Sequence, residues 1–362
     1  MGPREKELVA RVIDEAFPND GGYTTELERR VAEVCGVPHA VGVTSGTAAI
    51  FLALVGCGVG AGDEVLVPDV TFVATANAVT MTGARPVLVD VRREDLGIDP
   101  AAASAAITPR TRAIVPVHVS GRACDMEGVM ALAARHGLAV VEDAAEALGS
   151  RWRGRALGAV GRAGCFSFSA NKTVTAGQGG MIVTADAALH QRLRELKDQG
   201  RPVRGTGGDD EHPTLGFNFK LTNLQAAVAL AQMETLPERL EHQRRLYRTY
   251  RDGLAGAAGV LLPPFDLDGG EVPQWVDALV DDRDSLHDFL LERGIGTRKF
   301  WHPVHTHAPY RADGSAFPHA TEIGRRGLWL PSSLRLEDED VATVCASIRA
   351  WAESRTSRPA VR

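Results

Sequence analysis

Five short runs rich in Val and Ile recur up to residue 143, and segments with helical periodicity separate them. The runs cover residues 39–43, 64–68, 86–91, 113–117 and 139–143. Each is almost continuously apolar, which is typical of strands buried on both faces. Among the intervening segments, residues 124–137 have helical spacing, with Asp125 as a candidate N-cap and Gly137 as a stop signal. Strands that alternate with helices predict a mainly parallel α/β sheet flanked by helices.

The character of the sequence changes after a long helical tract over residues 222–254, which we expect to break near Pro237. From residue 261 onward Pro and Gly cluster, and short strand patterns mix with helical ones. We therefore predict a large α/β domain over residues 1–245 and a smaller C-terminal α+β domain over residues 246–362. At 362 residues and 44% apolar content, the chain is long enough to give each domain its own core.

The charge pattern narrows the class of partner. The net charge is −6 and Lys and Arg form no block, which argues against binding to nucleic acid or to a membrane surface. Small molecules or proteins are the expected partners.

No apolar run is long enough to span a bilayer, and the charged first residues lack a signal-peptide core, so we expect a cytoplasmic protein. Five scattered cysteines without a C-x-x-C pair indicate reduced thiols.

Ligands of open α/β sheets bind beyond the carboxyl ends of the strands, so the residues that follow each strand are candidate site residues. After residues 39–43, Gly46, Thr47 and Ala48 open a helix, and unpaired amides at a helix N-terminus attract an anion such as phosphate. An ordinary N-cap explains this turn equally well.

Two carboxylates and an aromatic ring follow other strands. Asp143 ends the run at 139–143 and Glu146 comes three residues later. A partly buried carboxylate requires a positive partner, although Asp143 would also serve as a helix cap. Phe72 stands where a loop meets a helix and would lie flat on a planar ligand, or it packs in the core.

The stretch FSFSANKTVTAGQGG, residues 166–180, sets one lysine, Lys172, among small polar residues. A partly desolvated lysine has a lowered pKa, and its free amine attacks carbonyl groups. The Ser167 hydroxyl is a candidate anion ligand, and the glycines allow a tight turn around a ligand. Taken alone, Lys172 is also explained as a solubility device at a strand edge.

Taken together, these strand ends match the requirements of pyridoxal 5′-phosphate. Lys172 would form a Schiff base with the cofactor aldehyde, and Asp143 would keep the pyridine nitrogen protonated. Phe72 would cover one ring face. Ser167 and the turn at 46–48 would hold the phosphate.

Four long segments, residues 44–79, 107–126, 141–184 and 215–233, resemble the DegT/DnrJ/EryC1/StrS sugar aminotransferases. The resemblance runs from about residue 23 to about residue 351 and implies a fold type I enzyme that cycles between pyridoxal and pyridoxamine phosphate. It assigns the same roles to Lys172, Asp143 and Ser167, and it places Glu146 at the 3-oxygen of the cofactor. By the same resemblance, Asn218 reaches the phosphate of a neighbouring subunit, which implies a homodimer with shared active sites.

The sequence departs from the family pattern at two positions. Gln178 stands where the family usually has Glu, and Lys220 stands where Arg is common. Either change would affect how an anionic donor or substrate is held, because Lys lacks the bidentate fork of Arg. Lys172 itself argues against the dehydrase branch, which has His at this position. The resemblance therefore implies transamination, with an amino acid, usually glutamate, as donor.

Residues 297–310 resemble the GDP-perosamine synthase branch of the family, and so does the segment around Lys172. This likeness implies a nucleotide-linked keto-deoxysugar as acceptor, with 4-keto-6-deoxyhexoses as the first expectation. Trp301 and His305 are then candidate substrate contacts, together with Lys220. A 3-keto sugar or cyclitol aminotransferase of the same family is the alternative.

Other interpretations have weaker support. His302, His305 and His307 form H-x-x-H-x-H, but Pro303 and the spacing oppose a helical ligand pair, so we predict no metal site. The glycines at 56–61 end a helical pattern and do not follow a strand, so a helix C-cap explains them better than a dinucleotide fingerprint. A non-catalytic regulator on the same scaffold, or a lyase or aldolase acting on amino acids, stays open. A transamination assay separates these classes.

Overall fold

A seven-stranded sheet forms the centre of the computed structural model, which describes residues 1–202 and 210–356. The strand order is β1-β9-β8-β5-β4-β2-β3, and every strand except β9 runs in the same direction. The strands are β1 (His39–Val43), β2 (Glu64–Pro68), β3 (Arg85–Val89), β4 (Thr111–Ile114), β5 (Ala139–Asp143), β8 (Ala163–Ser167) and β9 (Gly180–Thr184). The predicted, mainly parallel sheet is confirmed.

Three of the five predicted strands, β1, β2 and β5, match the structure residue for residue. Strand β4 ends at Ile114, earlier than predicted, because Pro116 has no N–H to donate to the ladder. The chain nevertheless stays extended beyond it, and Val117 forms an isolated bridge with Asp143. The end of β4 therefore still lies beside the end of β5.

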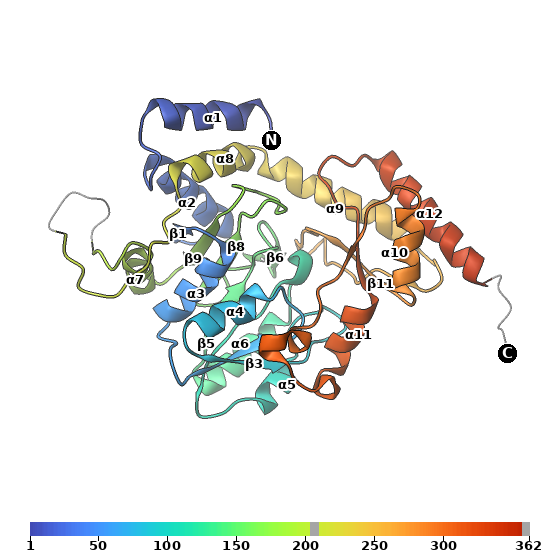
Figure 1. The fold of residues 1–362 in the computed structure, drawn as a ribbon, viewed down its shortest axis with the longest axis horizontal. Coiled ribbons are helices and arrows are strands. Elements are labelled where there is room, and N and C mark those ends of the chain that lie inside the picture. The colour runs from blue at the N-terminus through green and yellow to red at the C-terminus, as the bar shows by residue number, and fades with distance from the viewer. Residues whose placement is uncertain (203–209, 357–362) are drawn as a thin grey trace.

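Helices cover both faces of the sheet. On one side α3 packs against β8 and β9, and on the other α2 packs against β1, while α1 lies along α8 (Figure 1). The helices of this part are α1 (Pro3–Asp14), α2 (Gly22–Cys35), α3 (Gly46–Gly56), α4 (Ala74–Met81), α5 (Pro100–Ala105), α6 (Met126–His136), α7 (Ala187–Lys197), α8 (Asn223–Met233) and α9 (Leu236–Gly253).

The predicted start and end signals of the helices at 124–137, 56–61 and 222–254 are confirmed. The Asp125 carboxylate caps α6 by accepting from the Gly128 amide, and Gly137 ends α6 in the left-handed conformation at φ 66°. The segment at 56–61 is the end of α3 and its turn, so it does not follow a strand. The helical tract breaks between α8 and α9, and Pro237 stands in the first turn of α9.

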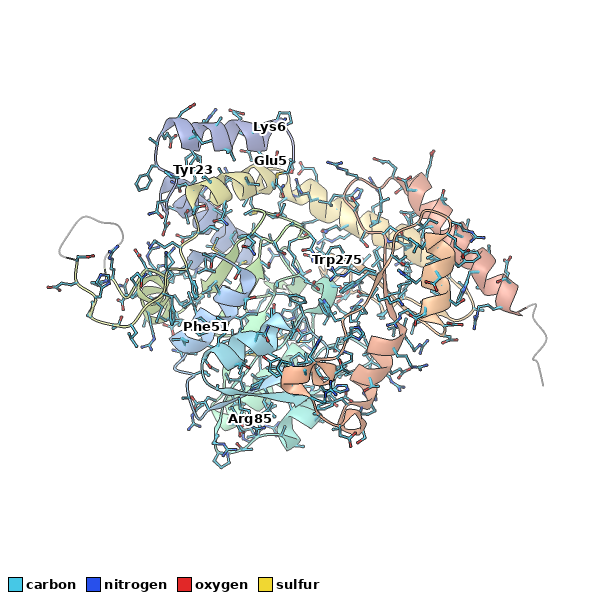
Figure 2. All side chains as sticks on the ribbon, viewed as in Figure 1. Glu5, Lys6, Tyr23, Phe51, Arg85 and Trp275 are labelled. Carbon is cyan, nitrogen blue, oxygen red and sulfur yellow. The ribbon has the colours of Figure 1, made fainter. Side chains whose placement is uncertain are left out.

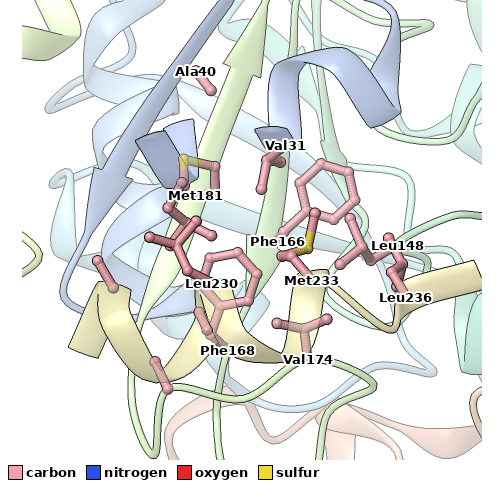
Figure 3. Packing of buried hydrophobic residues seen from close by; sticks show 14 of the residues in the cluster. Val31, Ala40, Leu148, Phe166, Phe168, Val174, Met181, Leu230, Met233 and Leu236 are labelled. Carbon is pink, nitrogen blue, oxygen red and sulfur yellow. The ribbon is translucent and has the colours of Figure 1, made fainter. Parts of the chain in front are cut away.

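The alternation of side chains along β8 divides the motif FSF between two environments. Phe166 and Phe168 are buried in the apolar cluster between the sheet and α8, with Met181 and Leu230 (Figure 3). Successive side chains of an extended chain point to opposite faces, so Ser167 is directed away from this cluster. It lies beside Gly46 at the start of α3.

The C-terminal part of the chain forms a second, antiparallel sheet with the order β10-β11-β13-β12. Its strands are β10 (Val260–Leu261), β11 (Val276–Val280), β12 (Arg298–Lys299) and β13 (Gly327–Leu330), and its helices are α10 (Arg283–Leu291), α11 (Pro318–Arg326) and α12 (Asp338–Thr356). Four short 3₁₀ turns lie at η1 (Val119–Gly121), η2 (Val304–Thr306), η3 (Ala308–Tyr310) and η4 (Gly314–Ala316), and a small hairpin joins β6 (Arg151–Trp152) to β7 (Arg155–Ala156). The predicted boundary at residue 245 falls inside α9, and the division into two domains stays a prediction.

No helix in the described part of the chain is both long and apolar enough to cross a membrane.

Candidate active site

A cavity of about 570 Å³ opens at the carboxyl ends of β1, β2, β5 and β8 and is closed on its far side by residues of the C-terminal sheet. It brings together most of the residues singled out from the sequence. Its wall contains Gly46, Thr47, Phe72, Asp143, Glu146, Ser167, Lys172, Gln178 and Trp301. Because the strands are parallel, residues far apart in the chain meet at one edge of the sheet.

Lys172 lies in the loop that joins β8 to β9, and Gly177 in this loop adopts φ 77°, which favours glycine. The Lys172 side chain is 13% exposed, and its ammonium donates to Oε1 of Glu146 at 3.0 Å. The indole N–H of Trp275 donates to the same oxygen at 3.1 Å, and the Ser120 amide donates to Oε2 at 2.9 Å. Trp275 is labelled near the centre of Figure 2, in the segment that leads into β11. Glu146 is therefore held on both oxygens and presents one of them to the lysine.

Asp143 ends β5 and is 6% exposed. Its Oδ2 accepts from the Thr75 hydroxyl at 2.7 Å and its Oδ1 accepts from the Ala145 amide at 3.1 Å. Burial raises the pKa of this carboxyl, and the hydrogen bond from Thr75 offsets only part of the effect. The carboxylate has no ion-pair partner in contact among the described residues. A protonated ring nitrogen from a ligand would supply that partner.

The start of α3 forms the third feature of the cavity. The Ser45 hydroxyl accepts from the Ala48 amide at 3.1 Å, so Ala48 completes the N-cap and does not line the cavity. The amides of the first helical turn have no acceptor within the helix, which leaves those of Gly46 and Thr47 beside the cavity. A Cβ at position 46 would come within 2.9 Å of the Ser167 Cβ. Only glycine lets this helix end approach Ser167 so closely.

Phe72 is an exposed aromatic ring, 53% accessible, in the wall of the cavity. Its nearest ring neighbour is Trp301 from the C-terminal part, with ring centroids 6.5 Å apart. A large apolar ring left open beside a cavity is a surface for a planar ligand.

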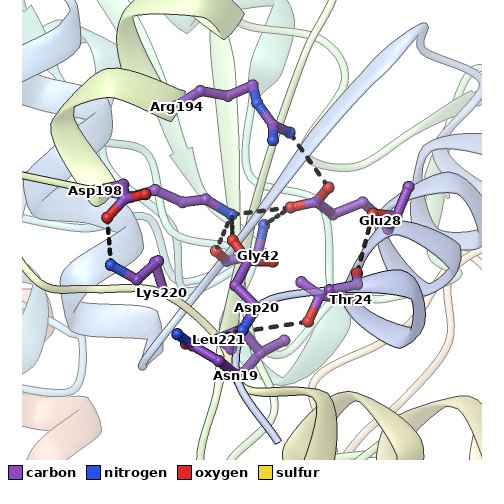
Figure 4. Close-up of polar contacts among 12 residues, drawn as sticks. Asn19, Asp20, Thr24, Glu28, Gly42, Arg194, Asp198, Lys220 and Leu221 are labelled. Carbon is purple, nitrogen blue, oxygen red and sulfur yellow. Dashed lines mark hydrogen bonds and ion pairs between the residues drawn. The ribbon is translucent and has the colours of Figure 1, made fainter. Parts of the chain in front are cut away.

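Besides Ala48, three other predicted residues, Asn218, Lys220 and His305, lie outside this cavity in the single chain. Lys220 contacts the Asp198 carboxylate, next to a buried cluster in which Lys197 pairs with Asp20 and Glu28 (Figure 4). Asn218 is exposed, and its backbone bridges Asp198.

His305 is buried, and its Nδ1 lies 2.5 Å from Oδ2 of Asp69. Its backbone amide donates to the other Asp69 oxygen, so the pair fixes the segment after Trp301 against the end of β2. Within the described residues no group of three His, Cys, Asp or Glu side chains could hold a metal ion.

The site also contains residues that the sequence did not single out. Thr75 and Trp275 fix the two carboxylates, and Arg298 and Trp329 line the cavity from the C-terminal sheet. The guanidinium of Arg298 stacks over the Trp329 ring at 5.3 Å. Thr75 comes shortly after the predicted strand at 64–68, one helical turn beyond Thr71. This position near a strand end is the only feature of the sequence that points to any of these four residues.

The residues present fit pyridoxal phosphate. The cavity offers an anion cradle at Gly46, Thr47 and Ser167, an open ring at Phe72, and a buried, cation-free carboxylate at Asp143. The only lysine in its wall, among the described residues, is Lys172.

Comparison with known proteins agrees with this chemistry. The family model described as "DegT/DnrJ/EryC1/StrS aminotransferase family" matches residues 1–349. The chain belongs to this family of sugar aminotransferases, which depend on pyridoxal phosphate. It is an α/β enzyme of fold type I, as the resemblance implied.

Two curated relatives are similarly close. A GDP-perosamine synthase of Caulobacter vibrioides is 39% identical over 353 residues, 95% of this chain and 94% of the relative. A dTDP-3-amino-3,4,6-trideoxy-alpha-D-glucose transaminase of Streptomyces venezuelae is 39% identical over 350 residues, 95% of this chain and 91% of the relative.

Solved structures give the same result. S. venezuelae DesV in complex with a ketimine intermediate superposes with a TM-score of 0.92 at 38% identity. The match covers 96% of this chain and 94% of the DesV chain. The PLP form of the putative sugar aminotransferase Spr1654 from Streptococcus pneumoniae gives 0.91 at 25% identity, covering 98% and 97%.

Proposed function

We propose that this sugar aminotransferase moves an amino group from L-glutamate to a nucleotide-linked 4-keto-6-deoxyhexose in the biosynthesis of an amino sugar. The observation that carries the proposal is the cavity around Lys172, in which an amine, a buried carboxylate and an anion cradle converge. The identity to GDP-perosamine synthase over 95% of the chain supports the choice of a 4-keto acceptor.

Each residue of the cavity has a role in this proposal. Gly46, Thr47 and Ser167 would hold the phosphate, Phe72 would cover the ring and Asp143 would keep the ring nitrogen protonated. Bound pyridoxal phosphate supplies an aldehyde that accepts an amine and a ring that withdraws electrons from the substrate carbon.

Lys172 would carry the proton-transfer role. Its Nζ would take a proton from the donor carbon that bears the amine and deliver it to C4′ of the cofactor, and in the second half-reaction it would carry a proton from C4′ to the sugar carbon that receives the amine. Glu146 accepts a hydrogen bond from this nitrogen at 3.0 Å and thereby orients it toward the cavity.

The rest of the predicted function follows the family pattern. We propose a cytoplasmic homodimer in which Asn218 of one subunit completes the phosphate site of the other. Asn218 is exposed here, which leaves its side chain available for such a contact. The first proposed substrate contact is Trp301, which lines the cavity. Lys220 and His305 stay predicted contacts that do not line the cavity of the single chain.

The test is a panel of purified nucleotide 3-keto and 4-keto sugars incubated separately with the enzyme and L-glutamate. Mass spectrometry of each reaction identifies an aminated product. The proposal expects a 4-keto sugar to be the best acceptor, judged by kcat/KM. Amination of only 3-keto sugars would contradict it.

A 3-keto acceptor is the second candidate. It rests on the S. venezuelae transaminase, whose name specifies a 3-amino sugar and whose identity to this chain is also 39%. The same panel separates the two candidates.

A further inference from the structure

A second cavity, of about 540 Å³, adjoins the first. Asn171, Lys172, Trp275 and Ser332 line both cavities, so the lysine stands at the boundary between them. A molecule bound beside Lys172 in the first cavity is therefore adjacent to the second.

The wall of this second cavity is cationic. Besides Lys172, it contains the guanidinium groups of Arg239 and Arg335, and no Asp or Glu among its described lining residues. Side-chain amides and hydroxyls make up most of the remainder, which are groups that donate hydrogen bonds to oxyanions.

Arg239, at the start of α9, is half-buried, and no carboxylate of a described residue contacts it. Its Nε donates to the Thr235 hydroxyl at 3.0 Å and its Nη1 donates to the Thr173 carbonyl at 3.2 Å. Burial lowers the pKa of this guanidinium, against a weaker and opposite influence of Glu5. Glu5 accepts from the Gly2 amide and from Gln232 and does not line the cavity.

Two further observations point to a missing ligand. Arg335, in the loop between β13 and α12, is exposed and forms no ion pair with a described residue. Gln274 is 5% exposed, and its buried amide nitrogen has no hydrogen-bond partner in the described structure. A buried donor without a partner is unfavourable unless a ligand or water satisfies it.

We infer that the second cavity binds the diphosphate of the nucleotide-linked sugar while the sugar ring occupies the first cavity beside Lys172. This inference rests on the proposed function, because it assumes a nucleotide sugar as acceptor. Two arginines suit the several oxygens of a diphosphate, since each guanidinium forms paired hydrogen bonds with phosphate. The anionic groups of the amino donor are carboxylates, and the first cavity already has Arg298 for one of them.

The test measures binding without turnover. Isothermal titration calorimetry of the loaded full-length enzyme with GDP, UDP and dTDP is compared for the wild type, Arg335→Met and Arg239→Met. The matched control is Arg325→Met, since Arg325 is exposed, lies outside both cavities and forms no ion pair with a described residue. Arg335 is the primary site because its side chain holds no other element in place.

We expect each cavity variant to weaken the best-bound nucleoside diphosphate by about tenfold or more, and the control to stay within about twofold. The rate at which L-glutamate converts the bound cofactor, followed by absorbance, should be unchanged in Arg335→Met. Unchanged nucleotide binding in both variants, or a loss confined to the glutamate step, would overturn the inference.

The design separates this inference from the proposed function. Arginine-dependent binding of a nucleoside diphosphate without amination of any keto sugar would leave the subsite standing and remove the proposed reaction. Amination of a keto sugar, with nucleotide binding unchanged in both arginine variants, would support the proposed reaction and remove the subsite.

Discussion

At the scale of single residues, Asp143 shows how the site is prepared for a cofactor. Among the described residues its carboxylate has two neutral donors and no cation in contact, so its buried, ionised form is unfavourable in the cofactor-free protein. A protonated ring nitrogen of the cofactor would relieve this cost. Asp143 should therefore destabilise the cofactor-free protein and stabilise the cofactor-bound protein.

This leads to a prediction with a definite pH dependence. The pKa of Asp143 is raised above its ordinary value of 3.8, so the folded chain keeps this proton to higher pH than the unfolded chain. Stability should then fall as pH rises through that window, because the native state binds more protons. Asp143→Asn should raise the stability of the cofactor-free protein at pH 8 by about 1 kcal/mol. This gain in stability should shrink as the pH is lowered toward 3.8, the ordinary pKa of the carboxyl.

Urea unfolding of both proteins at several pH values measures the difference. The same variant, loaded with cofactor, should lose at least about 100-fold in kcat, because the electrostatic partner of the ring is gone. A variant that is less stable than the wild type at every pH would contradict this account.

The sequence identified the reacting side chains but not the groups that hold them. Asp143 and Glu146 could be predicted because they follow a predicted strand, and strand ends meet at one edge of a parallel sheet. Lys172 could be predicted because it stands alone among small polar residues before a Gly-rich turn. Thr75, which bonds Asp143, is 68 residues away from it, and Trp275 is 129 residues away from Glu146. Nothing local in the sequence specifies such pairs, because the first depends on how α4 packs at the end of β5 and the second on how the C-terminal sheet docks.

At the scale of elements, the close approach of α3 to β8 determines the anion cradle. Strands β1, β2 and β5 could be predicted with the correct bounds because each is a short, largely apolar run. Strands β8 and β9 were not among the predicted strands, and their antiparallel pairing places Lys172 in the connecting loop.

Gly46→Ala tests this approach. The added Cβ would lie 2.9 Å from the Ser167 Cβ, so helix and strand must separate, at about 1–3 kcal/mol. We expect affinity for pyridoxal phosphate to fall by about tenfold or more. The matched control is Gly60→Ala, where a Cβ meets nothing within 4 Å. Equal affinities for the two variants, measured by fluorescence titration, would argue against the cradle.

At the scale of the whole molecule, a buried ion pair joins the two sheets near the site. Arg122, after the turn η1, donates to Oδ2 of Asp277 in β11 at 3.1 Å, and both side chains are 2% exposed. The Ser120 hydroxyl donates to Oδ1 of the same carboxylate, while the Ser120 amide holds Glu146. The docking of the C-terminal sheet is therefore coupled to the group that orients Lys172.

Removal of one partner should be costly. Arg122→Met leaves the Asp277 charge buried without its cation, and we expect a loss of about 3–5 kcal/mol in the free energy of unfolding. The double variant Arg122→Met/Asp277→Asn should recover part of that loss, because it removes the stranded charge. Chemical denaturation of both variants provides the comparison. A double variant less stable than Arg122→Met would show that the pair matters for another reason.

The most direct measurement uses the scarcity of lysine. The sequence has five lysines, Lys6, Lys172, Lys197, Lys220 and Lys299, and of these only Lys172 lines the cavity. Treating the pyridoxal phosphate-loaded enzyme with borohydride fixes the cofactor to the amine that holds it, and peptide mass spectrometry identifies that residue. The account predicts a single modified peptide carrying the cofactor on Lys172. Modification of another lysine, or of none, with the enzyme still active, would contradict it.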